Sequence, residues 1–126
     1  MLTFDEIGNM LDEIVSEFPQ ELFAELNGGV NLLPSIKMNE DAGVDDLYVM
    51  GEYCHDAMGR YINLYYGSIS VVCAYFTPSH LRERLRKLVS HELTHHIESL
   101  AGERTLEIKD ERQIERFREQ SRGESL

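Results

Sequence analysis

The longest stretch of this chain that can form one continuous helix runs from Pro78 to Ala101. Thr77 can cap its start, and Pro78 stands at the first helical position, where its missing N–H is not needed. Gly102 is the natural stop at the other end. The large apolar residues recur at helical spacing and form one stripe, made of Leu81, Leu85, Leu88 and Val89. We therefore expect a helix over residues 78–101 with one face in the core.

A His-Glu-x-x-His motif lies near the end of this predicted helix, at His91, Glu92 and His95. On a helix the two histidines are one turn apart, about 6 Å along the axis and roughly 40° around it, so both imidazoles can reach one ion. If the apolar stripe is continued along the helix, Glu92 and His95 fall on it and His91 lies at its edge. A solvated charged face is the alternative interpretation, but such a cluster would lie opposite the leucines. The motif therefore predicts a Zn²⁺ site on the core side of the helix.

The chemistry of such a site assigns a role to each residue of the motif. A catalytic zinc has three protein ligands and a water whose pKa it lowers toward about 7. His91 and His95 are the expected ligands, and Glu92 is the expected general base that activates the zinc-bound water. The expected function is that of a zinc-dependent metallopeptidase. The alternative is a non-catalytic binding module, with or without metal; a metal-dependent ribonuclease would want a third histidine and a basic surface.

Composition limits the domain count and the partners. With 126 residues, 42% of them hydrophobic, the chain is expected to form one domain with its own core. The net charge of −11 is uneven, because residues 1–60 hold thirteen acids and two bases whereas residues 61–126 hold ten of each. An acidic first half argues against a nucleic-acid partner and could favour basic peptides, although acidic surfaces also confer solubility. We expect a peptide or protein substrate; the oligomeric state stays open.

Cysteine usage and hydropathy predict the compartment. The chain has two cysteines, no signal-like start, and no apolar run near the roughly 20 residues of a membrane span. We expect a cytoplasmic protein with reduced thiols and no membrane partner. Cys73 lies in an apolar run and is expected in the core. Cys54 and His55 would point to opposite faces of a strand, which disfavours a second metal pair.

The first half of the chain shows clear element signals. Thr3 and Glu6 form a capping-box pattern ahead of apolar residues at helical spacing, which predicts a first helix that ends before Pro19. A second short helix is expected over 21–26, a strand over 30–34, and a polar acidic loop over 37–46.

The second half is predicted from β-prone runs and charge. Strands are expected over 47–53 and 61–66, the latter ended by Gly67. Residues 69–76 are expected to form a fourth strand or apolar chain leading into the motif helix. A strand ahead of that helix could hold a peptide by backbone pairing. After Gly102 we expect a short apolar segment at 106–108, a charged helix from 110 to about 119, and fraying over 118–126.

Several segments together carry a family resemblance. They are the opening helix with Phe18-Pro19-Gln20-Glu21-Leu22-Phe23, then Leu47-Tyr48 with Gly51-Glu52-Tyr53, then Ile62-Asn63-Leu64-Tyr65-Tyr66-Gly67, and Val89-Ser90-His91-Glu92-Leu93-Thr94-His95-His96. In these the chain resembles the small family of predicted zinc metallopeptidases with a minimal zincin-like fold. The resemblance implies a single α+β domain over 1–126, in which a few-stranded mixed sheet packs on the active-site helix between N-terminal and C-terminal helices. It also implies zinc on His91 and His95, with Glu92 catalytic.

The third zinc ligand is where the sequence departs from that family. The family motif is commonly His-Glu-x-x-His-His-Phe-Gly followed shortly by an aspartate, but this chain has Ile97-Glu98 for Phe-Gly and Ala101 at the aspartate's place. The segment that opens at Asp110 resembles the stretch that opens with that aspartate. Asp110 is therefore the first expectation.

Other acids remain alternatives for this ligand. Glu103, just past Gly102, is the second choice and Glu107 the third. Glu98 lies a full turn beyond His95 and would more easily orient a ligand than complete the sphere. His96 points roughly 100° away from His95 and is expected to be packed or to support a ligand.

Overall fold

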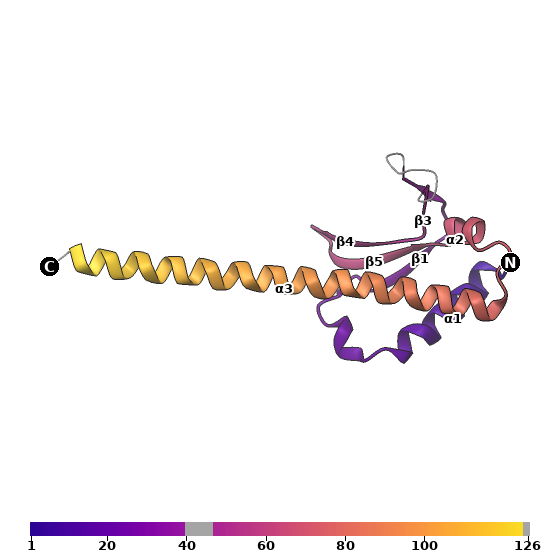
Figure 1. Ribbon diagram of the computed structural model, residues 1–126, viewed down its shortest axis with the longest axis horizontal. Helices are drawn as coiled ribbons and strands as arrows, with labels where there is room; N and C mark the ends of the chain where they lie inside the picture. The colour runs from indigo at the N-terminus through magenta and orange to yellow at the C-terminus, as the bar shows by residue number, and fades with distance from the viewer. Residues whose placement is uncertain (40–46, 125–126) are drawn as a thin grey trace. The chain divides into compact units, whose positions relative to one another are not determined.

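The computed structural model describes residues 1–39 and 47–124, with side chains described up to residue 116. The chain divides into two compact units, Met1–His96 and Ile97–Leu126. The first unit contains all the strands, and the second is helical (Figure 1). The helix α3 (Pro78–Glu124) begins in the first unit and supplies the second. The expectation of an α+β protein is confirmed.

A three-stranded mixed sheet forms the centre of the first unit. Its strand order is β1-β5-β4. The central strand β5 (Gly59–Tyr65) pairs in parallel with β1 (Val30–Leu33) and antiparallel with β4 (Gly51–Asp56). The inward residues of β5 are fully buried, and Ile62 and Leu64 are both 0% exposed.

One hydrophobic core fixes the helices to this sheet. The helix α1 (Phe4–Glu17) and the first part of α3 lie on the same side of the sheet (Figure 1). Their apolar stripes meet the inward face of β5, as helical spacing predicts. The buried core residues of these elements are Ile7, Leu11, Ile14, Ile62, Leu64, Leu81, Leu85, Leu88, Val89 and Leu93.

The local signals of the first half are confirmed. The capping box is complete, because Thr3 Oγ1 accepts from the Glu6 N–H at 3.2 Å and Glu6 Oε1 accepts from the Thr3 N–H at 3.0 Å. A short 3-10 helix, η1 (Gln20–Phe23), overlaps the predicted second helix. The predicted strands over 30–34 and 61–66 are β1 and β5, each within about a residue at its C-terminal end.

The β-prone run at 69–76 does not form the fourth strand that was one of the two expectations; its first residues are helical, and residues 73–77 lead into α3. The chain turns at once into a second helix, α2 (Tyr66–Val72). Gly67, predicted to end the strand, opens this helix and packs against residues 35–36, where an added Cβ would lie within 2.8 Å of their backbone. Ser68 anchors the same turn by accepting from the Lys37 N–H at 2.9 Å. These tertiary contacts override the β-propensity of Ile69, Val71 and Val72.

A second, two-stranded sheet replaces part of the predicted acidic loop and divides one predicted strand. Lys37–Met38 form β2, paired antiparallel with β3 (Tyr48–Val49). The predicted strand over 47–53 is therefore split into β3 and β4. Met50 separates them, and its carbonyl accepts from the Tyr65 N–H at 2.8 Å. The rest of the predicted loop, residues 40–46, lies outside the described residues.

The predicted helix stop at Gly102 is wrong, because α3 continues through it to Glu124. Gly102 has no positive φ, and no atom lies within 4 Å of the position its Cβ would take. The apolar segment at 106–108 and the predicted helix opening at Asp110 are therefore interior positions of α3. Glycine lowers helix propensity without forbidding the helix, and the good helix formers on both sides carry it through.

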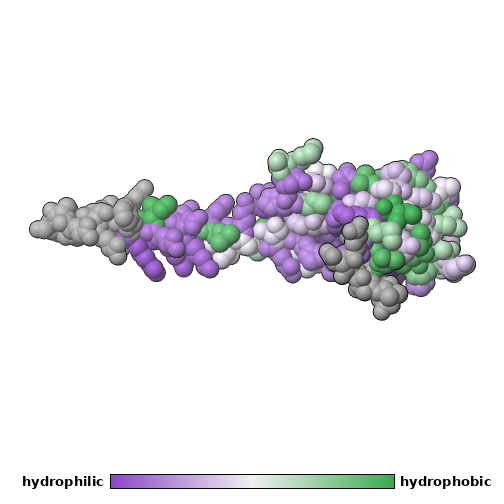
Figure 2. Space-filling model, turned by 90° about the horizontal axis from the view of Figure 1, so that it is seen from above, coloured by the Kyte–Doolittle hydropathy of each residue, from purple (hydrophilic) through white to green (hydrophobic). Residues whose placement is uncertain are grey.

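Surface hydropathy differs between the two units. In the first, exposed apolar side chains gather around α2 (Figure 2), and the exposed residues of α2 and the neighbouring segments are Ile36, Met38, Val71, Val72 and Tyr75. In the second, the described side chains of 97–116 are exposed or half-buried, and half of them are charged. Within the described residues no helix is long and apolar enough to cross a membrane.

Replacing Gly102 by alanine tests whether it is a helix interior position. We expect Gly102→Ala to stabilise the helix locally by about 1 kcal/mol, because alanine has the higher helix propensity and meets no neighbour. Slower amide hydrogen exchange in the surrounding residues would report this. If Gly102 instead ended the helix in a left-handed conformation, alanine would speed exchange there.

Candidate metal centre

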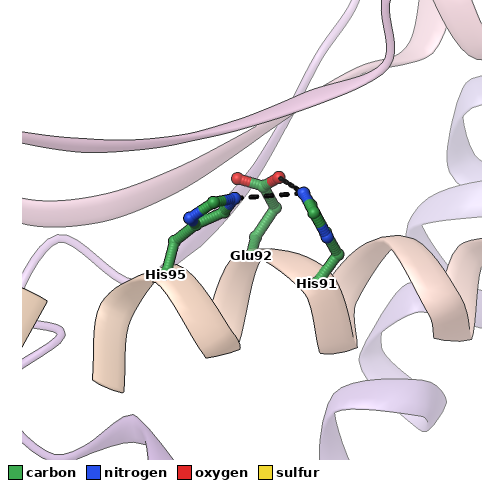
Figure 3. A group of neighbouring side chains, drawn as sticks. All are labelled: His91, Glu92 and His95. Atoms are coloured by element: carbon green, nitrogen blue, oxygen red, sulfur yellow. Dashed lines mark hydrogen bonds and ion pairs between the residues drawn. The ribbon is translucent and has the colours of Figure 1, made fainter. Parts of the chain in front are cut away.

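The three motif residues come together on adjacent turns of α3. One potential ligand atom from each of His91, Glu92 and His95 lies within 4.8 Å of the others. The two Nε2 atoms are 3.0 Å apart, and the rings meet edge to face with centroids 4.6 Å apart. Glu92 Oε1 is 3.9 Å from His91 Nε2. Figure 3 shows all three side chains reaching toward one point beside the helix; the i, i+4 spacing predicts this for His91 and His95, whereas Glu92 reaches it from a position roughly 100° around the helix from His91.

Burial separates the carboxylate from the imidazoles. Glu92 is 5% exposed and lies on the core stripe, as expected from its spacing to Leu85 and Leu88. His91 is exposed, as expected of a residue at the edge of the stripe, but His95 is exposed as well, so its expected place on the core side is wrong. The group therefore combines one carboxylate held by the core with two imidazoles open to solvent.

The protein keeps this carboxylate at an energetic cost. Burial raises the pKa of Glu92 above its ordinary value, and the nearby Glu52 carboxylate adds to that rise. His95 and His91 act in the opposite direction, since positive charge on either ring favours the carboxylate. The backbone N–H of Tyr53 also lowers this pKa by hydrogen bonding to Glu92. A carboxylate with a raised pKa beside two histidines is suited to accepting a proton.

The hydrogen bond from Tyr53 comes from the outer edge of the sheet. Tyr53 lies opposite Ile62 in the β4–β5 ladder, and Ile62 donates its N–H to Gly29 on the far side of β5. Tyr53 and Ile62 are therefore a non-hydrogen-bonded pair, so the peptide N–H of Tyr53 points away from β5. The outer edge of β4 thus faces α3 at Glu92 and supplies the backbone donor that holds its carboxylate.

A buried chain of hydrogen bonds fixes Tyr53 in turn. Its hydroxyl lies 2.8 Å from His96 Nδ1 and accepts from Arg60 Nη1 at 2.9 Å. His96 is 0% exposed, and its Nε2 lies 2.8 Å from the carbonyl oxygen of Ala24. Because a carbonyl only accepts, His96 donates from Nε2, and in the neutral ring Nδ1 then accepts from Tyr53. The expectation that His96 is packed is confirmed.

The candidates for a third ligand are not part of the group. Among the described residues the metal-competent group holds His91, Glu92 and His95, without Asp110, Glu103, Glu107 or Glu98. These four acids are exposed and lie in the second unit. The helix stop expected at Gly102 and the helix start expected at 110 are both wrong because α3 runs through both residues. The identity of the third ligand stays a prediction.

The residues present fit the first part of a zinc site. Two ligands of a tetrahedral zinc with metal–nitrogen bonds of about 2.0–2.1 Å lie about 3.3 Å apart. The observed 3.0 Å between the two Nε2 atoms is close to this distance. Both rings are exposed, so an ion can reach them without opening the core. Imidazole nitrogen and carboxylate oxygen are both donors that zinc accepts.

Sequence reasoning missed Tyr53 and Arg60 as supports of the site. The tyrosine belongs to a set of six that share β-prone surroundings, and nothing in the local sequence distinguishes it. Arg60 lies at 6% exposure, which is unusual for a cation. Its partners lie in other elements, so the signal is tertiary.

Comparisons with known proteins give a likeness among solved structures. No protein-family model and no curated protein matches the chain. Among solved structures, a conserved hypothetical protein from Thermo thermophilus superimposes with a TM-score of 0.67 at 28% sequence identity. The match covers 79% of this chain and 98% of that chain. The fold of this chain is therefore similar, over most of its length, to that of this conserved hypothetical protein.

Removing the Tyr53 hydroxyl tests the buried chain. Tyr53→Phe leaves Arg60 and His96 each without one partner, so we expect the free energy of unfolding to fall by about 1–3 kcal/mol. Tyr48→Phe is the control, since its hydroxyl has no partner among the described residues, and should change stability by less than about 0.5 kcal/mol. Urea unfolding with a chelator present measures both. Equal losses in the two variants would refute the role assigned to Tyr53.

The pH dependence of stability tests the cost of Glu92. Below its ordinary pKa, near 4.5, the carboxyl is neutral in both folded and unfolded states. As pH rises past that value the unfolded state ionises more easily, so stability falls until pH passes the raised folded pKa. Glu92→Gln should therefore raise metal-free stability at pH 7 and lose this advantage near pH 4. An equal effect of Glu92→Gln at both pH values would contradict the assignment.

Proposed function

We propose that this chain is a zinc-dependent metallopeptidase with a zincin-like domain. The observation that carries the proposal is the group itself: two exposed imidazoles with Nε2 atoms 3.0 Å apart, beside a carboxylate that is 5% exposed. A solvated surface cluster gives no reason to hold the carboxylate in the core. A catalytic base benefits from such burial, because burial raises the pKa of a carboxylate and a fixed orientation aims it at the attacking water.

The ligands and the metal have separate tasks in this proposal. His91 and His95 bind the ion through their Nε2 atoms, which requires each ring to carry its proton on Nδ1. Zinc, when bound, supplies a Lewis acid that lowers the pKa of a coordinated water toward about 7 and polarises a carbonyl. Glu92 remains outside the ligand set as the proton acceptor.

Glu92 moves the proton that peptide hydrolysis requires. Its carboxylate oxygen takes a proton from the attacking water as the water oxygen bonds to the scissile carbonyl carbon. The same carboxyl then donates that proton to the amide nitrogen as the carbon–nitrogen bond breaks. The Tyr53 N–H keeps the carboxylate oriented through both steps, since it is a backbone donor fixed by the sheet.

The outer edge of β4 is the proposed place for the substrate. The run at 69–76, which was expected to pair with a peptide, forms α2, so this role passes to another strand. Peptide groups at alternate residues of β4 point away from β5, and Tyr53 among them lies beside Glu92. An extended peptide laid along this edge would bring its backbone to the catalytic group.

A binding module is the second candidate, and one observation favours it. Two histidines leave zinc with too few protein ligands for a stable catalytic site, and the described residues add no further donor to the group except Glu92. We retain Asp110 as the proposed third ligand, with Glu103, Glu107 and Glu98 as alternatives. A module that keeps the zincin-like fold without turnover needs none of them.

Zinc content and peptide hydrolysis together test the proposal. We expect about one zinc per chain in the wild type, and loss of binding in His91→Ala and His95→Ala. Glu92→Gln should bind zinc with near wild-type affinity and lose hydrolysis of an unstructured peptide, because the base is not a ligand. His80→Ala is the control, since this exposed histidine lies outside both the group and β4, and its loss should leave both properties unchanged.

The outcomes separate the two candidates and the ligand alternatives. Zinc binding without any hydrolysis over a broad peptide library would favour the module. Stoichiometric zinc in both histidine variants would refute the metal site. Asp110→Ala should weaken zinc binding at least tenfold; if it does not and a glutamate variant does, the ligand is that glutamate.

A further inference from the structure

The sheet has a second outer edge, at β1, and a groove runs beside it. The groove lies between α1 and β1 and has a volume of about 480 Å³. Its lining includes Phe4, Asp5, Gly8 and Asp12 from the helix and Val30 and Leu32 from the strand. Because the strand order is β1-β5-β4, this groove lies at the opposite edge from the candidate metal centre.

The backbone of β1 offers unused hydrogen-bonding groups to this groove. Ile62 donates to the Gly29 carbonyl at 2.9 Å, which sets the register of the parallel ladder. In a parallel pair the peptide groups of alternate residues point away from the partner strand, and here these belong to Val30 and Leu32. Their N–H and C=O groups form no hydrogen bond among the described residues. An exposed edge of this kind is a template for an added strand.

The acidic charge of the groove favours an added strand with basic side chains. Asp5 and Asp12 line it from the helix, and no basic side chain is among its lining residues. Neither carboxylate forms an ion pair with another described residue. In an added strand, alternate side chains would face α1, where lysine or arginine would meet these two acids.

A glycine inside α1 keeps the groove open. Gly8 is an interior helix residue, where glycine costs about 1 kcal/mol relative to alanine. An alanine would fit, because its Cβ would meet only Leu32 Cδ2 at the ordinary contact distance of 3.9 Å. Packing within the chain therefore does not require glycine here. Because Gly8 has no side chain, it leaves space beside the edge of β1.

We propose that the β1 edge groove binds an extended basic segment of another protein, which adds to β1 as a further strand. Three independent features support this: the backbone groups of Val30 and Leu32 and the two aspartates, which have no partner among the described residues, and the space left by Gly8. The proposal does not depend on catalysis. If the chain is a peptidase, this edge would hold a part of the substrate protein distant from the cleaved bond.

A fluorescent peptide tests the groove directly. The probe is acetyl-Lys-Val-Lys-Val-Lys-Val-Lys-amide, and a matched peptide with glutamate for lysine is its control. Full-length protein is used with a chelator, so that cleavage plays no part. We expect the basic peptide alone to bind, with an affinity that falls as salt rises. Amide resonances of Val30 and Leu32 should shift, and their hydrogen exchange should slow.

Matched variants separate the groove from general attraction to an acidic protein. Asp5→Asn with Asp12→Asn should weaken binding at least tenfold, whereas Glu21→Gln, which removes an exposed charge outside the groove, should change it less than twofold. Gly8→Trp should fill the groove and abolish binding, and Gly8→Ala should raise the melting temperature while the peptide still binds. The aspartate pair keeps the test valid if Gly8→Trp does not fold.

Two results would overturn the proposal. One is the absence of binding to the folded wild type. The other is binding that leaves the Val30 and Leu32 amides unchanged, or that weakens equally in Glu21→Gln and in the aspartate variants.

Discussion

Burial of the Glu92 carboxylate against the outer edge of β4 is the constraint around which the first unit is arranged. A carboxylate at 5% exposure is costly unless hydrogen bonds and charges offset its lost hydration. The offset comes from the Tyr53 backbone N–H and from the two exposed imidazoles. These sources lie on different elements, so the carboxylate is stable only where α3 and β4 are held together. The leucines of α3 and the inward residues of β5 provide that attachment.

The two adjacent histidines show how one helix serves two purposes. A single step along a helix turns the side chain by roughly 100°, so neighbours cannot share a face. His95 is exposed beside His91, whereas His96 is 0% exposed and lies between Tyr53 and the Ala24 carbonyl. The buried histidine therefore ties α3 both to β4 and to the segment after η1. The same tyrosine that contacts His96 through its hydroxyl holds Glu92 through its backbone.

Because α3 continues through Gly102, the residues that follow the motif are helical and do not form a turn. The family that the sequence resembles has a glycine and an aspartate soon after the second histidine, and this chain has neither at those places. Here the residues that follow remain helical and belong to a second unit whose described side chains are exposed or half-buried. The chain lacks the glycine and the aspartate that follow the family motif, and at these places its helix continues. The buried Glu92 carboxylate beside two histidines supports the enzyme, and the unassigned third ligand supports the module, so both proposals are kept.

The sequence by itself determined those features that depend on residues close together in the chain. The capping box at Thr3, the stripe of leucines, and the gathering of His91, Glu92 and His95 follow from helical spacing, which needs no distant partner. The tertiary structure decided the rest. The β-prone run at 69–76 became α2 because Gly67 and Ser68 pack on the segment at 35–37, and β2 formed because β3 was available to pair with it. Tyr53 and Arg60 became supports of the site through partners at least seven residues away. Contacts of this kind depend on how the elements pack, and that information is not contained in local spacing.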